Sequence, residues 1–279
     1  MKSRIVLLIA IFVSLGIIYA LLNAEKEQIN SNEQPMEQNQ VCVKLVYDKP
    51  IEGYEVTADW QPFEVKDCET GYITINFRDI STGKEFQYIN REKFSSYHTD
   101  LITSAENFDC YKDGEVYHIE YATKPNSFEE SPLDYYLPFQ FYDVDFDGEK
   151  ELLINNYEKG QQGNGYDVFE ITDAGLEEKS YPPFDSVDNM MKFDNQSKII
   201  SCYMHDGSYY AMEVRYQKVD RISKQNLSIP NGLDDKLKNS LSNLEPDAPS
   251  DFHIVAAEIS MGEAEYKLKV QNGGWLLIE

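Results

Sequence analysis

The feature that most constrains the fold is a series of short segments in which apolar and polar residues alternate. These segments recur from VCVKLVY at 41–47 to WLLIE at 275–279, with turn-forming residues between them. Alternation with period two places one face of a strand against a core and leaves the other face in solvent. Asp206-Gly207, Asn272-Gly273 and the segment STGK at 81–84 stand where tight hairpin turns are expected. The chain is therefore predicted to be all-β and built from antiparallel hairpins.

One helix is expected among the strands. Leu233, Leu237, Leu241 and Leu244 are spaced four, four and three residues apart, and Pro246 follows them. We expect this helix to pack its leucine stripe across one end of the sheets. Hairpins joined by loops fit either a sandwich or a β-propeller, and the sequence contains no exact repeat that would separate the two.

The N-terminal residues predict that the rest of the protein is located outside the cytoplasm. Lys2 and Arg4 precede an unbroken apolar run from Ile5 to Leu22, long enough to span a bilayer. Residues 1–24 are expected to be an uncleaved anchor or a signal peptide cleaved after Ala24, and both alternatives stay open. Residues 25–40 have the polar composition of a tether. Residues 41–279 are then one β-rich domain in the periplasm or at the cell surface.

The charge of the chain restricts its partners. The net charge is −24, and loss of Lys2 and Arg4 with the first segment would make it −26. Such a surface disfavours nucleic acid and anionic lipid, so membrane contact is expected only through the N-terminal segment. It favours cations or a basic protein as partner. High acidity also aids solubility by itself, which remains the simpler explanation.

Four cysteines suit an exported protein. Cys42, Cys68, Cys110 and Cys202 allow three pairings, and no C-x-x-C spacing for zinc or redox chemistry occurs. A disulfide between Cys42 and Cys68 is the first choice, because both residues belong to the N-terminal group of strands. Free buried thiols are the alternative if the chain is not exported.

One stretch has the spacing of a calcium loop. Residues 143–154 read DVDFDGEKELLI, with Asp143, Asp145 and Asp147 at places one, three and five. Gly148 allows a sharp turn at place six, Glu149 offers its backbone carbonyl at place seven, and Glu151 supplies a carboxylate at place nine. Ca²⁺ takes six to eight oxygen ligands, so this spacing predicts a calcium site. The alternative is a solvated acidic turn, because Asp and Gly favour turns for backbone reasons.

The twelfth place of this loop departs from the EF-hand pattern. An EF-hand has a bidentate Glu there and a helix on each side, whereas this chain has Ile154 inside the apolar run ELLINNY. That run predicts a strand. The loop is therefore expected to join two strands and to have a structural role.

Three segments together with this loop resemble a known bacterial group. They are GYITINFRDISTGKEFQYI at 71–89, GQQGNGYDVFEI at 160–171 and KFDNQSKIISCYMHDGSYYAMEVRY at 192–216. They resemble exported calcium-loop β-propeller proteins related to FG-GAP and VCBS repeats. Within that group they are most similar to the periplasmic immunity and lysozyme-inhibitor family found beside peptidoglycan-hydrolase effectors.

The resemblance implies a small β-propeller that binds calcium structurally and inserts a loop into the cleft of a hydrolase. Lysozyme inhibitors use a Ser-Gly loop followed by Tyr. The nearest segments here are 206–210 and 163–166, and neither has the leading serine. These segments supply the candidate partner-binding residues, which are Asn164, Tyr166, Asp206, Ser208 and Tyr210.

Catalytic motifs are absent from the sequence. It contains no H-E-x-x-H, no G-x-S-x-G, and no glycine fingerprint followed by a helix. We therefore expect a non-enzymatic inhibitor or immunity protein whose partner is a basic cell-wall hydrolase. The alternatives are a membrane-tethered surface module without inhibitory role and a carbohydrate-active enzyme.

Overall fold

The computed structural model describes most of the predicted β domain. The described residues are 42–64, 67–95, 113–121, 131–134, 136–156, 159, 165–206, 210–244 and 250–278. The chain divides into two compact units, Met1–Gln40 and Val41–Glu279, and every described residue belongs to the second. The predicted segments 1–24 and 25–40 lie outside the described residues. In the part that is described, no helix is long and apolar enough to cross a membrane.

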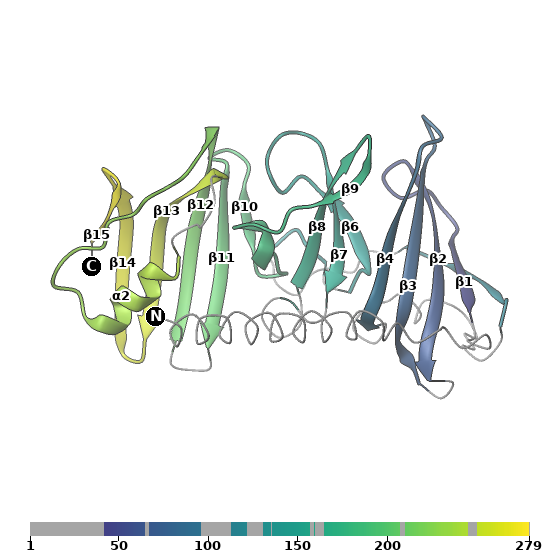
Figure 1. The fold of residues 1–279 in the computed structure, drawn as a ribbon, viewed down its shortest axis with the longest axis horizontal. Coiled ribbons are helices and arrows are strands. Elements are labelled where there is room, and N and C mark those ends of the chain that lie inside the picture. Colours follow the sequence, from purple (N-terminus) through teal and green to yellow (C-terminus); the bar gives the residue numbers. More distant parts are fainter. Residues whose placement is uncertain are drawn as a thin grey trace, which may run out of the picture. The chain divides into compact units, whose positions relative to one another are not determined.

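The described residues form three β-sheets (Figure 1). Sheet A has the order β4-β3-β2-β1-β5, sheet B the order β6-β7-β8-β9, and sheet C the order β10-β11-β12-β13-β14-β15. The strands of sheet A are β1 (Val43–Tyr47), β2 (Tyr54–Glu64), β3 (Asp67–Asp79), β4 (Glu85–Ser95) and β5 (Val116–Ile119). Those of sheet B are β6 (Phe139–Tyr142), β7 (Glu151–Asn156), β8 (Gly165–Thr172) and β9 (Gly175–Glu178). Those of sheet C are β10 (Lys192–Asp194), β11 (Ile199–Asp206), β12 (Tyr210–Ser223), β13 (Ser250–Met261), β14 (Ala264–Gln271) and β15 (Gly274–Leu277).

Most neighbouring strands follow one another in sequence and pair antiparallel, as hairpins require. The predicted turn at STGK joins β3 to β4, where Gly83 has φ +72° and Asp79 accepts hydrogen bonds from the backbone of Ser81 and Thr82. Asn272 and Gly273 both have positive φ between β14 and β15, as a type I′ turn demands. One pairing departs from the hairpin pattern, because β5 joins β1 in parallel.

Sheet B is buried on both faces, and its central strand explains why. Along β7 the first five residues are all buried. Leu152 and Ile154 join the core that sheet B forms with sheet A, whereas Leu153 joins the core formed with sheet C. Because successive side chains point to opposite faces of a strand, an unbroken apolar run fits a strand covered on both sides.

The predicted helix is present as α2 (Asp235–Ser242). Asp234 caps its N-terminus by accepting a hydrogen bond from the backbone N–H of Leu237 at 2.9 Å. Leu237, Leu241 and Leu244 are buried in the same core as the inner face of sheet C. A short 3₁₀ turn, η2 (Phe184–Ser186), places Phe184 in that core.

The all-β expectation is confirmed, but a propeller is not. In a propeller each sheet has a neighbour on both faces, because the sheets close into a ring. Here only sheet B has a neighbour on each face in the described residues. The second faces of sheets A and C carry polar or charged side chains open to solvent, such as Lys44 on β1 and Lys269 on β14. The three sheets therefore pack in series, and no closed ring is found among the described residues.

Candidate functional site

The acidic loop joins β6 to β7, between two strands as predicted. Asp143 accepts hydrogen bonds from the backbone N–H groups of Asp147, at 3.2 Å, and Gly148, at 3.1 Å. Asp147 accepts one from the N–H of Glu149 at 2.8 Å. Gly148 has φ +97°, a backbone conformation that glycine adopts without strain. Hydrogen bonds to its own carboxylates and the positive φ of one glycine therefore help to set the backbone conformation of the loop.

Three of the five predicted metal ligands come together. Carboxylate oxygens of Asp143, Asp145 and Glu151 lie within 4.8 Å of one another and could hold a metal ion. Asp145 and Glu151 are buried, and Asp143 is half-buried. The carboxylate of Asp147 is exposed and lies outside this group. Glu149, which was predicted to offer its backbone carbonyl and not its side chain, is also exposed. Asp143, Asp145 and Glu151 are called the acidic triad below.

Two lysines that the spacing did not predict pair with the two buried members of this triad, Asp145 and Glu151. Lys179, just after β9, places Nζ 2.6 Å from Asp145 Oδ2 and 2.8 Å from Glu151 Oε1, and its side chain is only 7% exposed. Lys218 on β12 donates to the backbone carbonyl of Asp145 and lies 3.3 Å from Asp145 Oδ1. The lysines are 34 and 73 residues away from Asp145, so no local pattern links them to the loop.

The protonation of the triad follows from burial and from these lysines. Burial raises the pKa of the Asp145 carboxyl, but the hydrogen bonds and charges of Lys179 and Lys218 outweigh it and hold that pKa below its usual value. For Glu151 burial prevails and raises the pKa. Burial lowers the pKa of Lys179, but its bonds to Asp145 and Glu151 reverse the direction and leave it above the usual value. Lys179 is therefore a protonated cation within the triad at neutral pH.

The acidic loop makes contacts with all three sheets. Glu151 begins β7 of sheet B, and Lys218 ties Asp145 to sheet C. On the other side, Lys150 pairs with Glu52, in the β1–β2 turn of sheet A, at 2.7 Å. The Lys150–Glu52 pair is about half exposed and contributes little, because water screens such pairs. The contacts of Asp145 with Lys179 and Lys218 are buried and half-buried, respectively, so removal of the Asp145 carboxylate would leave positive charge uncompensated away from water.

Of the five predicted partner-binding residues, the structure describes the side chains of Tyr166 and Tyr210. Tyr166 is 0% exposed and packs in the core between sheets B and C, so the prediction that it contacts a partner is wrong. The alternation of Tyr166 and Val168 along β8 is the reason, since both face that core. Tyr210 is half-buried, and its hydroxyl donates to Met212 Sδ at 3.5 Å. Asn164, Ser208 and the side chain of Asp206 lie outside the described residues.

The predicted disulfide is not formed in the structure. Cys42 carries a free thiol whose Sγ accepts a weak hydrogen bond from Gln61 at 3.9 Å. Register explains this, because Val43 pairs with Trp60 and Trp60 with Ile73, which places Cys68 several residues along a non-adjacent strand. The side chain of Cys68 and all of Cys110 lie outside the described residues, and Cys202 is a free buried thiol.

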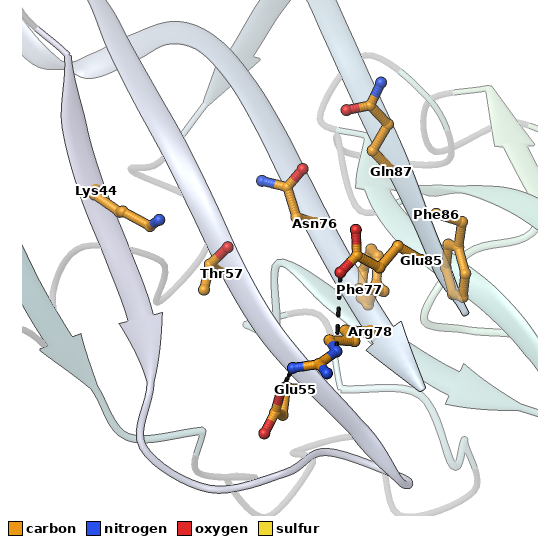
Figure 2. Close-up of a pocket in the computed structure, with 9 residues that line it drawn as sticks. All are labelled: Lys44, Glu55, Thr57, Asn76, Phe77, Arg78, Glu85, Phe86 and Gln87. Atoms are coloured by element: carbon orange, nitrogen blue, oxygen red, sulfur yellow. Dashed lines mark hydrogen bonds and ion pairs between the residues drawn. The ribbon is translucent and has the colours of Figure 1, made fainter. Parts of the chain in front are cut away.

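A shallow hollow of about 520 Å³ lies on the outer face of sheet A (Figure 2). Thr57, Asn76 and Gln87 stand side by side across β2, β3 and β4, because they are direct cross-strand partners. These three side chains are uncharged and carry hydrogen-bonding groups. They form the centre of the hollow, which is called the sheet A face below.

Charged side chains border this row. Arg78 lies between its cross-strand partners Glu55 and Glu85, at 3.2 Å and 3.8 Å, as the dashed lines of Figure 2 show. Lys44 on β1 borders the hollow from the other side. The alternation of polar residues along β2, β3 and β4 predicts that one face of these strands is exposed to solvent. Only the register of the strands shows which polar side chains are neighbours.

A second hollow of about 650 Å³ lies where β4 of sheet A meets sheet B. Its lining includes Tyr88, Phe169 and Leu176 and the acids Asp167 and Glu178. Both acids are held by Lys159, whose Nζ is 2.5 Å from Asp167 Oδ1 and 3.7 Å from Glu178 Oε1. The two acids that line this hollow are therefore already paired with Lys159 and are less available to a ligand.

Comparisons with known proteins add little to this geometry. No protein-family model matches the sequence, and no curated protein matches it. One solved structure, described as a Xanthomonas type IV secretion system related protein, aligns over 89% of this chain and 97% of its own chain. The identity is 12% and the TM-score 0.46, values that do not establish a shared fold or function. Neither these comparisons nor the three open sheets of the described residues support the resemblance to calcium-loop β-propeller proteins.

Proposed function

We propose that residues 41–279 form a non-catalytic protein-binding domain that acts outside the cytoplasm and inhibits a peptidoglycan hydrolase. The sheet A face is the observation that carries this proposal. It is a hollow on a broad sheet that is anchored by its inner face in an aromatic core, so its polar groups stand on a rigid support. A loop of a partner protein can donate to and accept from Thr57, Asn76 and Gln87 along one line.

The charge of the chain supports a basic partner. A net charge of −24 accelerates encounter with a cationic protein and makes the association rate fall as salt rises. The apolar run at 5–22 supports a site of action outside the cytoplasm. The choice of a hydrolase as partner, and of inhibition as outcome, is supported by the resemblance to the lysozyme-inhibitor family alone.

We also propose that the acidic triad binds Ca²⁺. Its donors are carboxylate oxygens on a loop with a glycine at the sixth place, the donor chemistry that this hard cation prefers. Bound calcium would supply positive charge at a loop that contacts all three sheets and would stabilise the fold. Because Lys179 already engages two of the carboxylates, we expect an affinity no tighter than about 10⁻⁴ to 10⁻³ M, the range of many extracellular modules.

A hydrolase assay tests the functional proposal. Purified residues 41–279 are added, with calcium present, to cell-wall suspensions that a panel of lysozyme-like and other peptidoglycan hydrolases clears. We expect the domain to slow clearing by at least one basic member of the panel. If micromolar domain inhibits none of them, a tethered surface module becomes the better account. Clearing by the domain alone would instead reveal an enzyme.

A further inference from the structure

The position of Lys179 within the acidic triad is the observation that leads furthest. Both buried carboxylates of the triad have every oxygen engaged. Asp145 Oδ1 accepts from the Asp147 N–H at 3.1 Å and faces Lys218, and Asp145 Oδ2 accepts from Lys179. Glu151 Oε1 accepts from Lys179, and Glu151 Oε2 accepts from the Val144 N–H at 3.0 Å. The ammonium groups of Lys179 and Lys218 therefore offset the charges of the two buried carboxylates, while Asp143 accepts hydrogen bonds from backbone N–H groups.

We infer that Lys179 is a built-in counter-ion of the acidic loop. Its ammonium group holds the loop closed in the absence of metal, and a divalent cation must displace it to reach Asp145 and Glu151. This inference rests on the proposed calcium site for the displacement step. Lys179 thereby sets how tightly the triad binds a cation. It acts as a competitor, because its Nζ occupies the same oxygens that the cation would take.

The surroundings of Lys179 show why its ammonium stays in place. The phenyl ring of Phe184 lies 5.6 Å from Nζ and offers a cation–π contact. The exposed carboxylate of Glu170 lies 3.7 Å from Nζ, on the solvent side of the cluster. Glu170 gives the displaced ammonium a nearby partner outside the triad, so exchange requires a change of rotamer and no movement of the strands.

The test compares the wild-type domain with Lys179→Met, which keeps the length of the apolar stem and removes the charge. Calcium binding is measured by titration calorimetry, and the melting temperature is measured in calcium and in EGTA. We expect Lys179→Met to bind calcium at least tenfold more tightly than wild type. We also expect its melting temperature to be lower than that of wild type in EGTA and to rise by more than that of wild type when calcium is added.

Lys159→Met is the matched control. Lys159 also pairs with two acids of sheet B, Asp167 and Glu178, but makes no contact with the acidic loop that is described. This variant should bind calcium as wild type does. If wild type and Lys179→Met bound calcium with equal affinity, displacement of Lys179 by calcium would be refuted, while the calcium site itself would be supported. Absence of binding by both would overturn the exchange and the calcium site together, without bearing on hydrolase inhibition.

A second measurement needs no variant and applies even if Lys179→Met does not fold. The ¹⁵N resonance of a buried, hydrogen-bonded ammonium is observable because its protons exchange slowly with water. For wild type in EGTA we expect such a signal from Lys179, with correlations to its side chain. The signal should disappear as calcium is added. Its persistence at calcium concentrations that saturate the protein would refute displacement.

Discussion

The substitution Asp145→Asn tests whether the acidic loop joins the sheets through buried charge. Asp145 is 8% exposed and interacts with Lys179 and Lys218, whose side chains are 7% and 18% exposed. Removing one partner of a buried ion pair costs about 3–5 kcal/mol, because the other charge is left uncompensated. Lys179 retains Glu151, so we expect a loss near the lower limit, about 3 kcal/mol in the free energy of unfolding.

This loss is large enough to measure by two methods. For a domain of this size each kcal/mol shifts the melting temperature by about 2–4 °C, which predicts a fall of about 6–12 °C in EGTA. Guanidinium unfolding of residues 41–279 gives the free energy independently. Asp143→Asn is the control, because Asp143 is half-buried and accepts only from backbone N–H groups in the described structure. We expect about 1 kcal/mol for this change. If Asp145→Asn cost no more than Asp143→Asn, the buried charges would not stabilise the fold.

Three further predictions follow from burial and protonation. Tyr166→Ala should lower the free energy of unfolding by about 3–5 kcal/mol, as for other large buried aromatic residues. Tyr166→Phe should leave hydrolase inhibition unchanged, because Tyr166 lies in the core and does not contact a partner. The pKa of Asp145 is depressed in the folded state, so its contribution to stability is present above the unfolded value near 3.8 and is lost as pH falls below it. Acid unfolding of Asp145→Asn should lack this component. Cys42 should react with a thiol reagent in the native domain, whereas Cys202, which is buried, should react only after unfolding; equal reactivity would contradict the packing of sheet C.

Local patterns in the sequence predicted the strands, the helix and part of the acidic loop. Alternation, the Asn272-Gly273 turn and the leucine spacing around Leu237 each depend on residues a few positions apart, and each is found in the structure. The same holds for the approach of Asp143, Asp145 and Glu151, which one short loop brings together.

Features that depend on contacts distant in sequence were not predictable in this way. The pairing of Lys179 with Asp145 joins residues 34 positions apart, and no local sequence pattern around either residue predicts it. The number of sheets that the described residues form, and the absence of a closed ring among them, depend on which faces of the strands are covered, which alternation does not specify. Tyr166 was misplaced because a tyrosine after glycines in a loop and a tyrosine at the start of a buried strand have the same local sequence.

Inhibition by variants of the sheet A face tests the central claim most directly. Asn76→Trp places a bulky ring in the middle of the hollow, and Gln217→Trp places the same ring on the outer face of sheet C, on a central strand. The inhibition constant of each variant is measured against a hydrolase that the wild-type domain inhibits. We predict that Asn76→Trp weakens inhibition at least tenfold, about 1.4 kcal/mol, while Gln217→Trp and wild type agree within twofold or so. Equal inhibition by Asn76→Trp and wild type, with both variants folded, would show that the sheet A face does not bind the hydrolase.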